Sequence, residues 1–292
     1  ILLPVDTVES LLAEGQFRIL DRRGSRFEGD RTSRVALDFG NNRLLAAKWA
    51  EAPRGGDETN NSPRYELAAY RIQSLFLEPY EYVVPPTVAR AFPLDWYRTL
   101  VPRARATFRG TESVVVVLQY WLFNVTPDGF WDEDRFARDT VYARHLANFN
   151  ILTYLIRHND ENEGNYLVSS SRGTPRVFSV DNGLSFDSEV SDVGAGWRSL
   201  NVDRLPGTTV DRLRALTEDQ LIRRLETVAE FRVREDNTLV AVTPGPALSG
   251  SRGIRQADGR IQFGLTRREI RDVWRRLQRL LDDVDDGDLQ VF

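Results

Sequence analysis

The sequence predicts an α+β protein with two lobes, and three observations lead to this prediction. Short apolar strands separated by turns fill the first half, amphipathic helices fill the second, and one hairpin lies at the entrance to the helical half. A chain of 292 residues with 41% hydrophobic content can bury two cores of this kind. We expect a strand-rich lobe over residues 1–122, a mainly helical lobe over 123–292, and an active site in the cleft between them.

In the first half, apolar runs and turn residues mark the elements. Gly40-Asn41-Asn42 stands between two apolar runs, which is typical of a strand–turn–strand unit. Pro85-Pro86 separates a segment with helical spacing from a run of valines. The elements expected here are strands over 34–39 and 43–48, a loop over 52–63, a helix over 65–77 and a fully buried strand over 114–118.

In the second half, apolar stripes and capping residues predict helices. Residues 135–156 carry a broad apolar face and read as one long helix. Thr217 with Gln220, and Thr266 with Glu269, form capping-box pairs that open two further helices, the first continuing to Val228. The expected hairpin pairs 165–168 with 176–180 across a Ser-rich turn.

The charge pattern limits the classes of function. The formal net charge is −4, and arginines alternate with acidic residues, which is typical of a solvated surface and argues against nucleic-acid binding. No apolar run approaches the roughly 20 residues of a membrane span. The chain has no cysteine, which excludes disulfides and thiolate metal sites and fits a reducing compartment, so we expect a cytoplasmic protein.

Lys48 is the only lysine in the chain; every other basic side chain is an arginine. It ends an apolar run, where we expect a strand to finish. Lysine offers a compact point charge on a flexible stem, whereas arginine offers a wide planar fork. The retained ammonium group therefore indicates a site that reaches between two phosphate groups, unless it is a chance survivor of compositional drift.

The most polar cluster follows the long helix. Residues 157–165 read Arg-His-Asn-Asp-Glu-Asn-Glu-Gly-Asn, and Asp181-Asn182-Gly183 follows the returning strand of the hairpin. Asp160, Asn165 and Asp181 would thus converge, and their hard oxygen ligands suit Mg²⁺ or Mn²⁺. Each segment could instead be a plain solvated turn. A calcium loop is disfavoured because Ser170 stands where it needs a glutamate.

Asp160 followed by Asn165, a hairpin, and then Asp181-x-Gly183 resembles the catalytic segment of the protein-kinase-like superfamily. The details of the motif look more like the atypical branch, which holds the Golgi casein kinases, the bacterial HipA-type kinases and the phosphatidylinositol 3- and 4-kinases. Within it, the Asp-Asn-Gly form, Glu66-Leu67-Ala68-Ala69 and the segment 84–88 look most similar to the Golgi casein kinase group. The resemblance covers roughly residues 24–190 and implies ATP with Mg²⁺ or Mn²⁺ as cofactors.

The resemblance also implies roles for particular residues. Lys48 would contact the α- and β-phosphates and pair with Glu66, Asp160 would orient or deprotonate the acceptor hydroxyl, and Asn165 and Asp181 would hold the metal ions. The segment 29–34, with Gly29 and Ser33, would cover the phosphates, although it lacks the Gly-x-Gly-x-x-Gly pattern. The segment 118–122, with Gln119, would be the hinge that meets adenine.

Other positions point to the fold or depart from the family. Asn159 stands where many protein kinases carry an arginine before the catalytic aspartate, which argues against control through activation-loop phosphorylation. His158 and His145 we interpret as structural residues.

These observations predict an ATP-dependent phosphotransferase, most simply one that phosphorylates a protein Ser/Thr hydroxyl. A lipid or small-molecule acceptor, AMP transfer and glutamylation stay open. The rival from another class is a pseudokinase that binds nucleotide as a scaffold, but the presence of all five core side chains favours an enzyme. A metal-dependent hydrolase built on Asp160 and Asp181 would leave Lys48 and Glu66 unexplained.

Overall fold

The computed structural model describes residues 3–24, 32–58, 62–160, 162–170, 175–186 and 196–292. Contacts within the chain define two compact units, each assembled from separate segments. Unit 1 comprises Ile1–Leu67, Pro86–Leu122 and Glu226–Leu265, and unit 2 comprises Ala68–Pro85, Phe123–Leu225 and Thr266–Phe292. Residues 226–265 therefore belong to the same unit as the N-terminal strands, and not to the unit of the helical segments that precede and follow them in the sequence.

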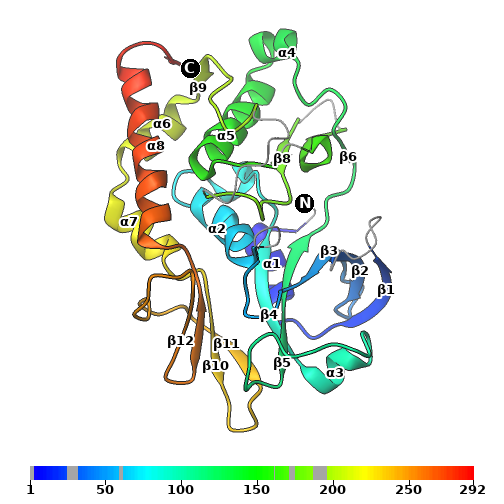
Figure 1. Cartoon of the computed structure of the whole chain (residues 1–292). Coiled ribbons are helices and arrows are strands. Elements are labelled where there is room, and N and C mark those ends of the chain that lie inside the picture. Colours follow the sequence, from blue (N-terminus) through cyan, green and yellow to red (C-terminus); the bar gives the residue numbers. More distant parts are fainter. Residues whose placement is uncertain (1–2, 25–31, 59–61, 161, 171–174, 187–195) are drawn as a thin grey trace. The chain divides into compact units, whose positions relative to one another are not determined.

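Unit 1 is built on a five-stranded antiparallel sheet with the order β1-β2-β3-β5-β4 (Figure 1). The strand–turn–strand unit predicted around Gly40 is confirmed, with Val35 paired to Ala47. The elements before residue 122 are α1 (Val5–Glu14), β1 (Arg18–Gly24), β2 (Thr32–Asp38), β3 (Leu44–Glu51), α2 (Pro63–Gln73), η1 (Pro79–Glu81), β4 (Thr87–Pro93), α3 (Leu94–Arg98) and β5 (Ser113–Tyr120).

One face of this sheet forms the core of unit 1. Alternate residues of its strands, such as Ala47 and Trp49 on β3, pack with Val8 and Leu12 of α1. Because successive side chains of a strand point to opposite faces, Lys48 lies on the other face. It also lies inside β3, which runs on to Glu51, so the expectation that the strand ends at Lys48 is wrong.

A second sheet in unit 1 was not predicted. It has the order β11-β10-β13-β12 and is formed by β10 (Ala229–Val233), β11 (Leu239–Val242), β12 (Ile254–Ala257) and β13 (Arg260–Phe263). We call it the inserted sheet. It is joined to the start of β5, where Ser113 Oγ accepts a hydrogen bond from the Leu239 amide at 2.9 Å. The second half was expected to be mainly helical, with one hairpin and with a helix as far as Val228; in this segment that expectation is wrong, because α7 ends at Leu225 and four strands follow.

Unit 2 is built around the buried helix α5, with a small antiparallel sheet β6-β7-β8 (Figure 1). The elements of this unit after residue 122 are β6 (Val125–Thr126), α4 (Glu133–Arg138), α5 (Thr140–Ile156), η2 (Glu163–Asn165), β7 (Tyr166–Ser169), β8 (Val177–Ser179), β9 (Arg204–Leu205), α6 (Gly207–Arg214), α7 (Glu218–Leu225), α8 (Arg267–Asp285) and β14 (Gln290–Val291).

The local signals of the second half are mostly confirmed. The hairpin β7–β8 forms, although the tip of its turn, 171–174, lies outside the described residues. Thr266 and Glu269 make the reciprocal capping box that opens α8. The single helix expected over 135–156 is instead two helices, because the Asp139 carboxylate accepts from the amides of Val141 and Tyr142 and starts α5 anew. Within the described parts of the chain, no helix combines the length and apolarity that a bilayer span requires.

Candidate active-site residues

In unit 1, the predicted ion pair between Lys48 and Glu66 is present. Lys48 Nζ donates to Glu66 Oε1 at 2.8 Å, and the two side chains are only 15% and 7% exposed. Strand β3 supplies the lysine and the first turns of α2 supply the glutamate. Shielding from water strengthens such a pair relative to one on the surface, so the position of the ammonium group is well defined.

Gln119 lies beside this pair on the neighbouring strand. It is the cross-strand partner of Lys48 in the β3–β5 ladder, and its buried amide donates to Thr87 Oγ1 at 3.0 Å. Its side chain thus joins β4 and β5. The next two amides along the chain also have partners within the protein: Tyr120 donates to the Pro86 carbonyl at 2.8 Å and Trp121 to the Ala46 carbonyl at 2.9 Å. Its assignment to an adenine site stays a prediction.

Of the segment 29–34, the structure describes only the end. Gly29 lies outside the described residues. Ser33 lies in β2, and its buried hydroxyl accepts from Arg22 Nε at 3.2 Å. Thr32, Ser33 and Arg34 are strand residues, so the expectation of a loop as far as Arg34 is wrong; the role of Gly29 and Ser33 in phosphate binding stays a prediction.

In unit 2, the chain leaves α5 through Arg157, which has left-handed φ and ψ and ends the helix. Two hydrogen bonds then tie this exit to the segment that follows β8. The Asn159 amide donates to the Leu184 carbonyl at 2.8 Å, and the Phe186 amide donates to the Ile156 carbonyl at 2.6 Å. The loop with Asp160 and the turn with Asp181 are therefore held against each other.

Tyr166, which no sequence motif singles out, holds this loop through its hydroxyl group. Its hydroxyl donates to the carbonyl of Asp160 at 2.9 Å and lies 3.3 Å from Nδ1 of His158. The contact fixes the main chain of Asp160, whose side chain is partly exposed. Nothing in the local sequence marks this tyrosine, because its partners are set by the fold of the loop.

His158 is completely buried at the base of the loop. Burial lowers its pKa to about 4, although the nearby carboxylates of Asp160 and Asp181 act in the opposite direction. The imidazole is therefore neutral near pH 7. This agrees with the interpretation of His158 as a structural residue.

Asn165 and Asp181, the predicted metal ligands, are brought together by the hairpin. The Val180 amide donates to the Asn165 carbonyl at 3.0 Å, which extends the β7–β8 pairing to the residue before Asp181. Asp181 is exposed and has a φ of 58°, a left-handed conformation that aspartate tolerates.

The donor chemistry of this pair fits a hard cation. Asn165 is 7% exposed, and its side-chain Nδ2 has no hydrogen-bond partner among the described residues. This nitrogen is a hydrogen-bond donor and cannot bind a cation, so the ligand that Asn165 would offer is its Oδ1. One carboxylate and one amide oxygen are ligands that Mg²⁺ or Mn²⁺ accepts together with water and phosphate oxygens. The described residues contain no cluster of three His, Cys, Asp or Glu side chains suited to a metal, as a self-sufficient protein cage would need.

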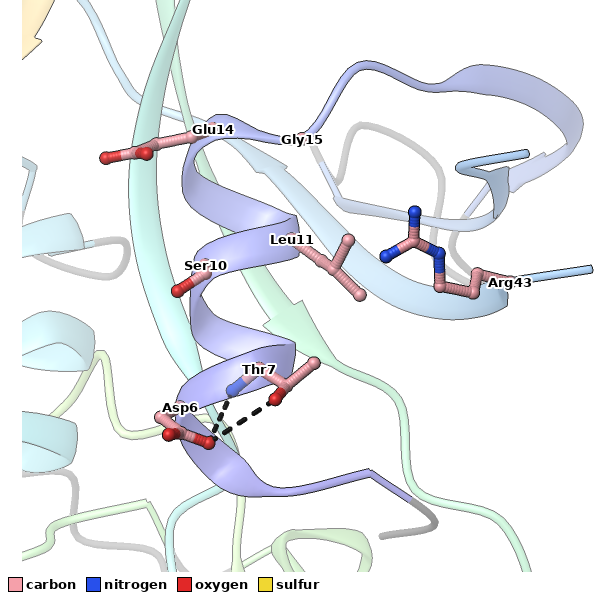
Figure 2. Close-up of a pocket in the computed structure, with 7 residues that line it drawn as sticks. All are labelled: Asp6, Thr7, Ser10, Leu11, Glu14, Gly15 and Arg43. Atoms are coloured by element: carbon pink, nitrogen blue, oxygen red, sulfur yellow. Dashed lines mark hydrogen bonds between the residues drawn. The ribbon is translucent and has the colours of Figure 1, made fainter. Parts of the chain in front are cut away.

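A separate pocket of about 450 Å³ lies in unit 1, away from every residue that the motifs single out. Figure 2 shows it along α1, with Arg43 coming from the turn before β3. Its lining residues are Asp6, Thr7, Ser10, Leu11, Glu14, Gly15 and Arg43. Charges of both signs and a wide opening give it no evident ligand chemistry, so we assign it no role.

Together these features define an α+β protein with two compact units, each of mixed α and β structure. A solved structure described as hydra Fam20 with sugar is similar to this chain, with a TM-score of 0.53 and 14% sequence identity. The similarity covers 98% of this chain and 90% of that one. No family profile matches the sequence, and no curated protein matches it. At this identity the likeness establishes the fold alone, and the predicted α+β class is confirmed.

Proposed function

We propose that this chain is an ATP-dependent phosphotransferase that transfers the γ-phosphoryl group to a hydroxyl, most simply that of a protein serine or threonine. The observation that carries the proposal is the ion pair of Lys48, the only lysine, with a buried glutamate on α2. All the remaining residues counted as Lys+Arg in this chain are arginines. The chain thus has a lysine, whose ammonium group acts as a point charge, only at this shielded site.

In this proposal, Lys48 binds oxygens of the α- and β-phosphates, and Glu66 holds the ammonium group in place. Lysine that bridges two phosphates stabilises charge that is already present and also charge that develops during transfer. Glu66 takes no part in bond making. The adenine ring would lie at the segment 118–122, which includes Gln119.

Asp160 would accept or orient the proton of the attacking hydroxyl, with Tyr166 fixing its main chain. Asn165 and Asp181 would hold Mg²⁺ or Mn²⁺, which when bound would neutralise phosphate charge. The remaining contribution is positioning: the hydroxyl must lie in line with the γ-phosphorus before the bond to the leaving oxygen breaks.

The decisive experiment measures transfer of labelled phosphate from [γ-³²P]ATP, with Mg²⁺ or Mn²⁺, to proteins of an extract and to a panel of peptides. Label on a Ser or Thr side chain, absent in the Asp160→Asn variant, is the expected result. Metal-dependent ATP binding without transfer to any acceptor would identify a pseudokinase instead. Absence of both binding and transfer would contradict the proposal as a whole.

A sugar hydroxyl is a second candidate acceptor, and a group of aromatic side chains in unit 2 favours it. Trp131 is 43% exposed and lies 5.8 Å from Trp197, centroid to centroid. Phe130 contacts Trp197 at 5.2 Å and Tyr166 at 5.6 Å, so the group reaches the tyrosine that holds the loop of Asp160. Flat aromatic faces bind the apolar faces of sugar rings, and the similar hydra Fam20 structure is described as holding a sugar.

The two acceptor classes can be separated with one variant. Trp131→Ala removes an exposed ring and leaves ATP binding intact. If the acceptor is a sugar, this variant should raise the KM for glycoside acceptors severalfold; unchanged kinetics with glycosides would contradict the sugar proposal. A preference for peptides over glycosides in the wild-type protein would favour the protein acceptor directly.

A further inference from the structure

We propose that the inserted sheet holds helix α2 in the rotation that presents Glu66 to Lys48, with Arg64 and Asp57 as the positioning residues that join the two. The inference rests on the proposed function, since it assigns a role to structure around the same ion pair. All of the residues involved belong to unit 1.

Arg64 lies in the first turn of α2 and is held by several contacts. Although it is an arginine, it is only 8% exposed. Its Nε donates to Asp57 Oδ2 at 2.6 Å, and its Nη2 donates to Tyr65 Oη at 2.7 Å. The guanidinium carbon also lies 4.1 Å from the centre of the Tyr65 ring. A buried arginine is costly unless its charge and its donors are matched, so these contacts hold its side chain firmly.

Arg64 also contacts the inserted sheet. A Cβ added to Gly253 would lie 2.6 Å from Arg64 Cδ and 2.7 Å from Arg64 Nε, so the main chain of Gly253 packs directly on the stem of the arginine. The same glycine accepts a hydrogen bond from the Gly264 amide at 2.9 Å, at the end of β13. Only a residue without a side chain allows this approach.

Asp57, which holds the charged end of Arg64, is itself anchored. The preceding residue, Gly56, has a φ of 87°, and a Cβ there would lie 2.7 Å from the Phe108 ring and 3.3 Å from the Phe263 ring. Phe263 belongs to β13, so the loop that carries Asp57 also packs on the inserted sheet. The Gly55 amide donates to the Thr107 carbonyl at 2.8 Å, and Thr107 Oγ1 accepts from the Val115 amide of β5 at 2.8 Å, so the loop is also tied to the main sheet.

The inserted sheet is in turn closed at its base by Arg255. This residue is 4% exposed, and its guanidinium donates to the carbonyls of Glu226 and Leu265, both at 2.8 Å. Glu226 and Leu265 are the two ends of the segment. Arg255 therefore holds the two ends of the segment 226–265 together.

Because α2 is a helix, fixing Arg64 also fixes the direction in which the side chain of Glu66 points. Residues two apart are separated by about 200° around the helix axis, so Arg64 and Glu66 project from roughly opposite sides of α2. Holding Arg64 on one side fixes the rotation of the helix about its axis. That rotation decides whether the carboxylate of Glu66 faces the ammonium group of Lys48.

Because Lys48 is the only lysine, a protein labelled with ¹³C at lysine Cε gives a single resonance from that side chain. Asp57→Asn keeps the size of the side chain and removes its charge. We expect this variant to shift the lysine resonance towards the chemical shift that it has in Glu66→Gln. In the Glu66→Gln background, Asp57→Asn should move it no further. Asp38→Asn is the matched control, since Asp38 pairs with Arg18 at 2.6 Å in the same unit and its hydrogen-bond partners Arg18 and Gly40 lie outside α2.

The binding of Mg–ATP provides the second readout. Asp57→Asn should weaken binding about fivefold in the wild-type background and by less than about twofold in the Glu66→Gln background, because residues that act through one network are not additive. Equal losses in both backgrounds, or a lysine resonance that does not move in Asp57→Asn, would overturn the inference. Failure of the wild-type protein to bind ATP would contradict the proposed function, while the lysine resonance would still decide the positioning role.

Discussion

Lys48 and Glu66 are separated by a strand end, a loop and the start of a helix, yet Lys48 Nζ lies 2.8 Å from Glu66 Oε1 with both side chains shielded from water. Leaving either charge alone in that place would cost several kcal/mol, on the order of 3–5 for a fully buried pair. The pair is thus a strong constraint on the contact between β3 and α2, and the predictions for the site start from it.

Lys48→Arg should abolish most phosphotransfer while the melting temperature changes little. The guanidinium can still pair with Glu66, but its fork is too wide to act as a point charge between two phosphates. The reverse exchange at an exposed arginine of the same segment, Arg43→Lys, is the control and should leave activity unchanged. Full activity in Lys48→Arg would mean that the lysine is an accident of composition.

Asp181→Ala should abolish metal-dependent nucleotide binding and preserve the fold. The exposed carboxylate is expected to be a metal ligand, and without it Asn165 is the only one of the two predicted ligands that remains. Calorimetry with ATP, in Mg²⁺ and then in excess chelator, measures the effect. Asp236→Ala, which removes an exposed turn carboxylate elsewhere, should bind as the wild type does. Binding to the wild type that is equally tight in chelator would contradict the assignment.

Asp160→Asn should keep ATP affinity within a few fold and lower turnover by roughly 10² or more, the loss expected for a general base or positioning group. The variant keeps an oxygen that can accept from the Asn162 amide, which Asp160 Oδ1 does at 3.3 Å, so the loop should retain its conformation. Single-turnover kinetics with saturating ATP separates the two effects. A parallel loss of affinity and turnover would show that Asp160 serves the nucleotide instead.

Protein stability should fall as the pH is lowered from about 6.5 towards 4. Burial lowers the pKa of both histidines in the chain, His145 and His158, to about 4, so the unfolded chain takes up protons first and is favoured in this window. Urea unfolding at several pH values measures the slope, and replacing both histidines by glutamine should flatten it.

Below about pH 4.5, Glu230 makes a separate contribution to the pH dependence of stability. Glu230 has its pKa lowered to about 2, chiefly by the hydrogen bond from Arg260, so the stability it contributes is present above its usual pKa near 4.5 and is lost only below that value. Glu230→Gln should leave the slope between pH 6.5 and 4.5 unchanged. A change in that upper window would mean that the histidines are not its source.

The elements that could be predicted are those whose signals are local. The turn at Gly40-Asn41-Asn42, the capping box of Thr266 with Glu269 and the hairpin after Asn165 each depend on residues a few positions apart, and each formed as expected. The inserted sheet could not be predicted in this way. Its strands are four or five residues long, and in β10 only Glu230 and Phe231 are buried, so the apolar alternation is too short to stand out.

The sequence by itself determined which side chains are candidates for chemistry: one lysine among arginines, and the polar residues that follow a long apolar helix and a hairpin. Only the tertiary structure decided that Lys48 lies within a strand and meets Glu66, that Tyr166 fixes Asp160, and that Arg64 is held by a sheet formed some 160 residues later. The physical reason is that side-chain chemistry is local, whereas a buried charge takes whichever partner the packing of distant segments brings within hydrogen-bond distance.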